Sequence, residues 1–156
     1  MRGKLDRIYH RQDGFTIIEI LVVIVIIGIL LALVFATYAG VARNERNQER
    51  RSDIQALYQQ MEAYYVKNLE YPTLADMNNP AWLSKNMKTL NRESLRDPSS
   101  TSYTLVATPQ PDRYAYAVRA ADGGACDNKT VICAHYVLTA TLEHSTPGIY
   151  FKDSLN

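Results

Sequence analysis

A single carboxylate stands inside the first long apolar segment, and its position is the strongest sign of chemistry in the sequence. Glu19 follows two isoleucines, and the next stretch, residues 20–42, contains no charged side chain. A carboxylate at bilayer depth costs about 3 kcal/mol and usually pairs with a cation, so it is a functional candidate by default. The alternative is that Glu19 lies at headgroup level, where the cost is small and no function follows. The residue types alone favour neither interpretation.

The two cysteines of the chain, Cys126 and Cys133, are the next residues that could react. If this part of the chain lies outside the cytoplasm, a disulfide that closes a short loop is the expected state. In a reducing compartment they remain free thiols. A metal site is disfavoured, because no second cysteine pair or histidine pair stands at ligand spacing. With the membrane topology argued below, we favour the disulfide.

No other set of side chains predicts catalysis. The three histidines form no ligand set, and no Ser-His-Asp, paired-carboxylate or phosphate-loop pattern is visible. Asp122, Asp127 and Asn128 lack the spacing of a calcium loop, so a solvated turn is the preferred interpretation. The formal net charge of +1 gives no electrostatic sign of a nucleic-acid partner. Net charge alone does not decide whether DNA is a ligand, so that question stays open. We therefore expect no catalytic residue, no metal and no cofactor.

Residues 20–42 are long enough to cross a membrane as a helix. At about 1.5 Å per residue they span roughly 34 Å, against about 30 Å for the hydrocarbon core. Residues 1–14 precede them with four basic and two acidic side chains. A short basic start before an apolar run is typical of the cytoplasmic side of a membrane. We expect residues 15–42 to form the transmembrane half of a helix that the mature protein keeps.

The helical period continues through residues 43–71, which predict an amphipathic second half. Apolar side chains recur there at intervals of three and four residues: Ile54, Leu57, Tyr58, Met61, Tyr64 and Tyr65. The helix should end before Tyr71-Pro72, because the residue before a proline avoids the helical region. Four arginines precede the stripe: Arg43, Arg46, Arg50 and Arg51. Pairing with Glu45 and Glu49 within the helix is the plainest expectation, and binding to lipid headgroups or to a neighbouring subunit are the alternatives. Residues 1–14, on the other side of the apolar segment, also hold four basic side chains. The count of basic residues therefore does not by itself decide which end of the chain lies in the cytoplasm.

Residues 72–156 are expected to form a globular head. Asn79-Pro80 predicts the start of a short helix. Strand patterns occur at residues 103–107, 114–119, 135–143 and 149–152. Short turns between them favour an antiparallel sheet, which the apolar stripe of the long helix needs as a partner. The predicted class is α+β: a long N-terminal helix, half transmembrane and half amphipathic, packed on a small antiparallel sheet.

The N-terminal segment resembles that of a known superfamily. Gly14 followed by FTIIEILVVIVIIGILLALV is similar to the processing site and helix of type IV prepilins and of the pseudopilins of type II secretion. The resemblance covers roughly residues 11–35, with the Gly14-Phe15 junction, Thr16 and Glu19 in the family's usual places. It implies a pilin-like fold with the C-terminal domain outside. It also implies that a prepilin peptidase cleaves after Gly14 and methylates the new amino group of Phe15.

The resemblance suggests how the carboxylate works. Cleavage leaves an α-amino group on Phe15 at the head of an apolar helix, and a buried charge is unfavourable unless it is paired. Pairing Glu19 of one subunit with the Phe15 amine of a neighbour satisfies both groups and fixes the axial register, and Thr16 belongs to the same assembly segment. Ala36 stands where many members carry a proline, which argues against local melting of this helix.

The predicted function is structural. The resemblance implies the subunit of a type IV pilus, used for adhesion, twitching motility or DNA uptake. Such a subunit begins as a single-pass protein in the lipid of the cytoplasmic membrane. A pilus assembly platform with its ATPase then polymerises it into a helical homo-oligomer at the cell surface.

Two alternatives stay open. The first is a pseudopilin of a type II secretion or competence system. Asp97-Pro98 resembles a loop of the major pseudopilins, but Ser99 and Ser100 replace the aromatic residue and glycine expected after it, which favours the pilus. The second, from a different class, is a membrane-anchored sensor or enzyme, which needs neither a cleavable junction nor a lone glutamate.

Overall fold

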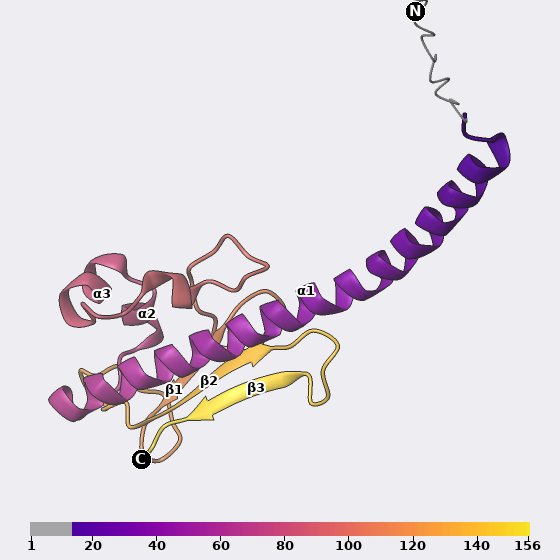
Figure 1. Ribbon diagram of the computed structural model, residues 1–156. Helices are drawn as coiled ribbons and strands as arrows, with labels where there is room; N and C mark the ends of the chain where they lie inside the picture. The colour runs from indigo at the N-terminus through magenta and orange to yellow at the C-terminus, as the bar shows by residue number, and fades with distance from the viewer. Residues whose placement is uncertain (1–13) are drawn as a thin grey trace, which may run out of the picture. The chain divides into compact units, whose positions relative to one another are not determined.

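The computed structural model describes residues 14–156, so all but the last residue of the predicted leader lies outside the described part. The chain divides into two compact units, Met1–Gly40 and Val41–Asn156. Helix α1, Ile17–Asn68, begins in the first unit and ends in the second (Figure 1). We describe the two units separately.

In the first unit, α1 is a continuous apolar helix. It passes through Gly28 without interruption. The large apolar side chains from Ile17 to Phe35 are all exposed, with half or more of the surface accessible in most of them. By length and composition, this helix can cross a membrane. Its apolar surface needs lipid or other protein around it.

In the second unit, α1 buries one face. Ile54, Leu57 and Met61 are fully buried, as the predicted stripe requires. The helix ends at Asn68, close to the predicted end. Leu69 has a left-handed backbone with φ of 58°, which turns the chain towards Pro72.

A three-stranded antiparallel sheet lies against this half of α1 in the order β1-β2-β3 (Figure 1). The strands are β1 (Ala115–Arg119), β2 (His135–Thr141) and β3 (Ile149–Asp153). In the central strand, Leu138 pairs with Tyr116 on one side and Lys152 on the other. The predicted α+β class, with a long helix packed on a small antiparallel sheet, is confirmed.

Short helices connect α1 to the sheet. They are α2 (Leu74–Met77), α3 (Pro80–Asn86) and the 3₁₀ helix η1 (Arg92–Leu95). The predicted helix at Asn79-Pro80 is confirmed as α3, because the Asn79 side chain caps it by accepting from the N–H groups of Ala81 and Trp82. The other two helices are too short to leave an apolar period, and the sequence did not predict them.

The predicted strand at residues 103–107 is wrong. Only Val106 makes a bridge to Ala115 there, among the described residues. The neighbouring Leu105 uses its backbone elsewhere: its N–H donates to Asn78 Oδ1 at 2.8 Å and its carbonyl accepts from Asn78 Nδ2 at 2.9 Å. A side-chain amide thus takes the backbone groups that a neighbouring strand needs.

Candidate functional site

The head of α1 is closed by a reciprocal pair of side-chain caps. Glu19 Oε2 accepts from the Thr16 backbone N–H at 2.8 Å and from the Thr16 hydroxyl at 2.9 Å. The Thr16 hydroxyl oxygen in turn accepts from the Glu19 N–H at 3.2 Å. This is a capping box, which satisfies N–H groups that have no partner within the helix. The Glu19 carboxylate is therefore held at the end of the helix where the predicted amine would appear.

The predicted processing junction lies open beside this cap. Phe15 is 84 % exposed and Ile17 is 87 % exposed. Among the described residues, no atom lies within 4 Å of the position that a Cβ on Gly14 would take, apart from its chain neighbours. The structure thus brings Phe15, Thr16 and Glu19 together at one exposed helix end, next to Gly14. These residues hold no arrangement typical of a catalytic centre.

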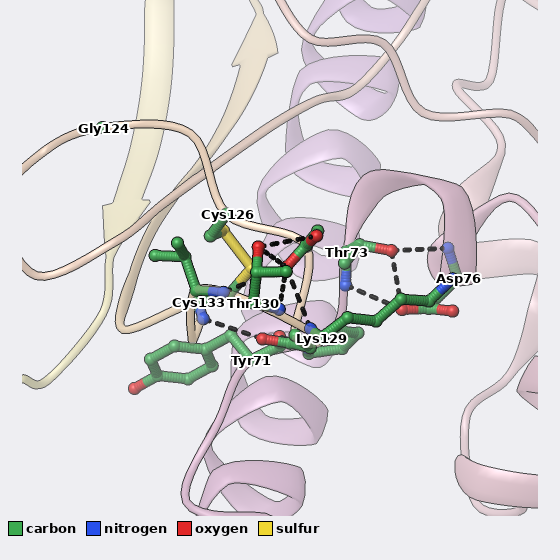
Figure 2. The surroundings of a disulfide bond; sticks show 12 residues. Tyr71, Thr73, Asp76, Gly124, Cys126, Lys129, Thr130 and Cys133 are labelled. Atoms are coloured by element: carbon green, nitrogen blue, oxygen red, sulfur yellow. Dashed lines mark hydrogen bonds between the residues drawn. A yellow bond between two sulfur atoms is a disulfide. The ribbon is translucent and has the colours of Figure 1, made fainter.

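The second predicted pair is joined. Cys126 and Cys133 form a disulfide with their Cα atoms 5.1 Å apart, which closes a short loop (Figure 2). Cys133 is fully buried in the core of the second unit. Its carbonyl accepts from the Tyr71 N–H at 2.9 Å, so the loop lies against the segment that follows α1.

Asp127 organises this loop from within. Its Oδ1 accepts from the N–H groups of Lys129, Thr130 and Val131 at 2.8–3.1 Å. These bonds, first that of Thr130, lower the pKa of the Asp127 carboxyl well below its usual range. Among residues 14–156, no three histidine, cysteine or acidic side chains gather in a way that could hold a metal ion. The Asp127 carboxylate thus stabilises the turn formed by residues 127–131.

Asn128 connects the disulfide loop to the end of α1. Its Nδ2 donates to the Tyr71 carbonyl at 2.7 Å, and its Oδ1 accepts from the Cys133 N–H at 2.7 Å. Its backbone is left-handed, with φ of 56°, a conformation that asparagine tolerates better than most residues. The Asn128 side chain therefore bridges the backbone at Tyr71 and the backbone at Cys133.

Sequence reasoning missed the main charged cluster of the second unit. The Arg50 side chain is 1 % exposed and donates to Asp97 through Nε at 2.7 Å and Nη2 at 3.0 Å. Its Nη1 donates to Glu143 at 2.7 Å, and Arg46 Nε also donates to Glu143, at 2.8 Å. The cluster therefore ties α1 to two loops of the head.

The expected pairing of the arginines with Glu45 and Glu49 is wrong for Arg46 and Arg50. Their partners lie far along the chain, which helical spacing cannot show. One signal was available: Arg50 stands four residues before Ile54 on the buried face of the helix. A charged side chain in that stripe must be buried, and a buried charge needs a partner.

The electrostatics of the cluster follow from its geometry. Burial lowers the pKa of Arg50, but hydrogen bonds to Asp97 and Glu143 more than offset this and raise it overall. The hydrogen bond from Arg46 and the nearby Arg50 lower the pKa of Glu143 to about 2. Both groups therefore stay charged across the physiological range.

Comparison with known proteins gives two matches. Residues 9–35 match the family model described as the prokaryotic N-terminal methylation motif. The chain is also similar to the type II secretion system core protein G of Dickeya chrysanthemi, with 46% identity over 63 residues. That match spans 40% of this chain and 41% of the relative, so it covers well under half of either protein. No solved structure matches the chain. Both matches point to a structural subunit and not to an enzyme.

Proposed function

Because the chain carries a prepilin-type methylation motif and is homologous to core protein G, within the type IV pilin and pseudopilin superfamily, we propose that it is the structural subunit of a helical filament. The observation that carries the proposal is that the matched motif coincides with an exposed apolar helix headed by one carboxylate. An apolar surface of that size persists only in lipid or against other subunits.

Processing comes first in the proposed sequence of events. A prepilin peptidase cuts after Gly14, removing the basic leader of residues 1–14, and methylates the new amino group of Phe15. The open backbone at Gly14 and the exposed Phe15 support this step, because a protease needs an extended and accessible bond.

Assembly then uses Glu19. Before assembly its carboxylate is held by Thr16 of the same chain. These bonds lie on the exposed helix end, so they exchange at little cost. In the filament, the carboxylate pairs with the Phe15 amine of a neighbouring subunit, which neutralises two charges in apolar surroundings and sets the axial register.

The location of the protein changes along this path. Residues 15–42 anchor the precursor in the cytoplasmic membrane with the head outside, where the disulfide is stable. The assembly platform and its ATPase then extract the subunit from lipid into the filament. The product of this assembly is an extracellular type IV pilus.

A pseudopilus of type II secretion is a second candidate, favoured by the similarity to core protein G. The two candidates are separated by deleting the gene for this protein in its host, imaging filaments on the cell surface and measuring protein secretion. Loss of surface filaments with normal secretion supports the pilus, whereas loss of secretion from cells that have no surface filaments supports the pseudopilus.

The proposed function is tested by intact mass and by Glu19→Ala. The mature chain should begin at Phe15 and carry one added methyl group. Glu19→Ala should be inserted and processed normally, but filament yield should fall by about two orders of magnitude, because an unpaired buried amine costs about 3 kcal/mol or more. Glu70→Ala, which removes a carboxylate from the second unit, is the control. A native chain that keeps Met1, or full assembly of Glu19→Ala, contradicts the proposal.

A further inference from the structure

Two of the acidic side chains on α1, Glu45 and Glu49, are exposed and one helical turn apart near the start of the second unit. The arginines beside them turn to the head: Arg46 and Arg50 bind Glu143 and Asp97. In the part of the chain that the structure describes, no basic side chain lies within ion-pair distance of either glutamate.

A basic hollow lies near the other end of the same half-helix. It has a volume of about 390 Å³ and is formed by α1, the C-terminal end of α3 and the segment that follows α3. Three exposed lysines and no carboxylate line it: Lys67, Lys85 and Lys88. Between residues 14 and 156 none of the three has an ion-pair partner. The Thr89 hydroxyl donates to Gln60 Oε1 at 2.8 Å and holds the wall of the hollow against α1.

The acidic pair and the hollow lie on one face of α1. Counting by three and four residues from Glu45 gives a single stripe that ends at Lys67: Glu45, Glu49, Ser52, Ala56, Gln60, Ala63 and Lys67. The fully buried positions Ile54, Leu57 and Met61 lie on the opposite side of the helix. The two ends of the stripe are exposed and can meet another molecule, with Glu45 and Glu49 at one end and Lys67 at the other.

We propose that this stripe is a contact between copies of the chain, in which Glu45 and Glu49 of one copy bind the lysine hollow of the next. The inference rests on the proposed filament, in which all subunits point the same way. For parallel copies, the contact requires an axial displacement equal to the spacing between the glutamates and Lys67, about 30 Å at 1.5 Å per residue. Charge complementarity within one sequence favours a second copy as the occupant.

The contact is tested by charge reversal in the full-length chain expressed in its host. Lys67→Glu with Lys88→Glu should lower filament yield about tenfold or more, because like charges then face each other in every repeat. Glu45→Lys with Glu49→Lys should do the same. All four substitutions in one chain restore opposite charges with the signs exchanged, and filament yield should recover. Lys129→Glu, an exposed reversal in the disulfide loop, is the matched control.

Each outcome decides the matter. Recovery in the fourfold variant supports the contact. Wild-type yield from either double variant overturns it, as does failure of the fourfold variant to recover when both double variants are depleted, folded and processed. Failure of the fourfold variant to recover indicates that the lysines bind an anion other than Glu45 and Glu49. If even the wild-type chain forms no filament, the proposed function fails, whereas loss of this contact alone leaves the Glu19 result intact.

Discussion

The two halves of α1 place the same kinds of residue in opposite surroundings. In the first unit Leu30 is 56 % exposed, whereas in the second unit Leu57 is fully buried against the head. The second half therefore has its apolar partners within the chain. The first half must find them in lipid or in other copies, so its contribution to stability appears only after insertion or assembly.

The charged residues differ in the same way. Within residues 14–156, the Glu19 carboxylate accepts its hydrogen bonds from Thr16, three residues away and exposed to solvent. Arg50 is buried and joins Asp97 to Glu143 across the head. A charge held by an exposed neighbour can exchange partners, while a buried and fully bonded charge cannot do so without unfolding its surroundings. The comparison separates an exposed carboxylate with local partners from a buried arginine whose partners lie far along the chain.

The largest effect on stability is expected from Arg50→Ala. Removing the guanidinium leaves Asp97 buried without its partner, so the free energy of unfolding of the head should fall by about 3–5 kcal/mol. Denaturant unfolding of the full chain in detergent, followed by the fluorescence of Trp82, measures this. Glu19→Ala should leave that transition unchanged. An equal loss for both variants contradicts the division between the two charges.

A matched pair of leucines tests the apolar half of the comparison. Leu57→Ala should destabilise the head by about 3 kcal/mol, because it opens a cavity in a packed core. Leu30→Ala removes the same atoms from an exposed position, so the same unfolding transition should not move. A shift of the Trp82 transition by Leu30→Ala means that the first half of α1 supports the head directly.

The smallest effect concerns Asp53, whose carboxylate accepts from the Tyr114 hydroxyl at 2.7 Å. Burial, together with the nearby Glu49 and Asp97, raises its pKa from 3.8 to about 6, although the Tyr114 hydrogen bond acts against this. The folded state therefore binds the proton more tightly than the unfolded state. The contribution of Asp53 to stability should fall as pH rises from about 4 to about 6.

Asp53→Asn removes this titration. The variant should gain stability relative to the wild type between pH 4 and pH 6, and the gain should level off above pH 6. Melting curves of both proteins across that range measure the difference. Asp153→Asn, at an exposed position on β3, is the control. A difference that is constant with pH contradicts the raised pKa.

The spacing of apolar residues predicted most of the fold, because a helix or strand with one buried face carries apolar side chains at regular intervals. The stripe from Ile54 to Met61 marked the buried face of α1, and alternation marked β2. Residues 103–107 misled because their residue types favour a strand, but Asn78 binds Leu105 from another part of the chain. A contact of that kind depends on tertiary structure and leaves no local trace.

The candidate site residues divide along the same line. Contrast with the apolar run singled out only Glu19, and the resemblance to prepilins added Gly14, Phe15 and Thr16, because that motif is local in sequence. The partners of Arg50 were not, because Asp97 and Glu143 are ordinary loop residues until the fold brings them together. The lysine hollow was hidden for the same reason, since its walls come from two separate segments.

The bonds that hold Tyr71 also constrain the order in which the head can form. Its N–H donates to Cys133 and its carbonyl accepts from Asn128, so the segment that ends α1 is completed by residues synthesised long after it. Until those residues are made, the backbone groups of Tyr71 have only water as a partner. The head can therefore close only after residues 128–133 are synthesised, and the disulfide that they carry belongs to the same late part of the chain.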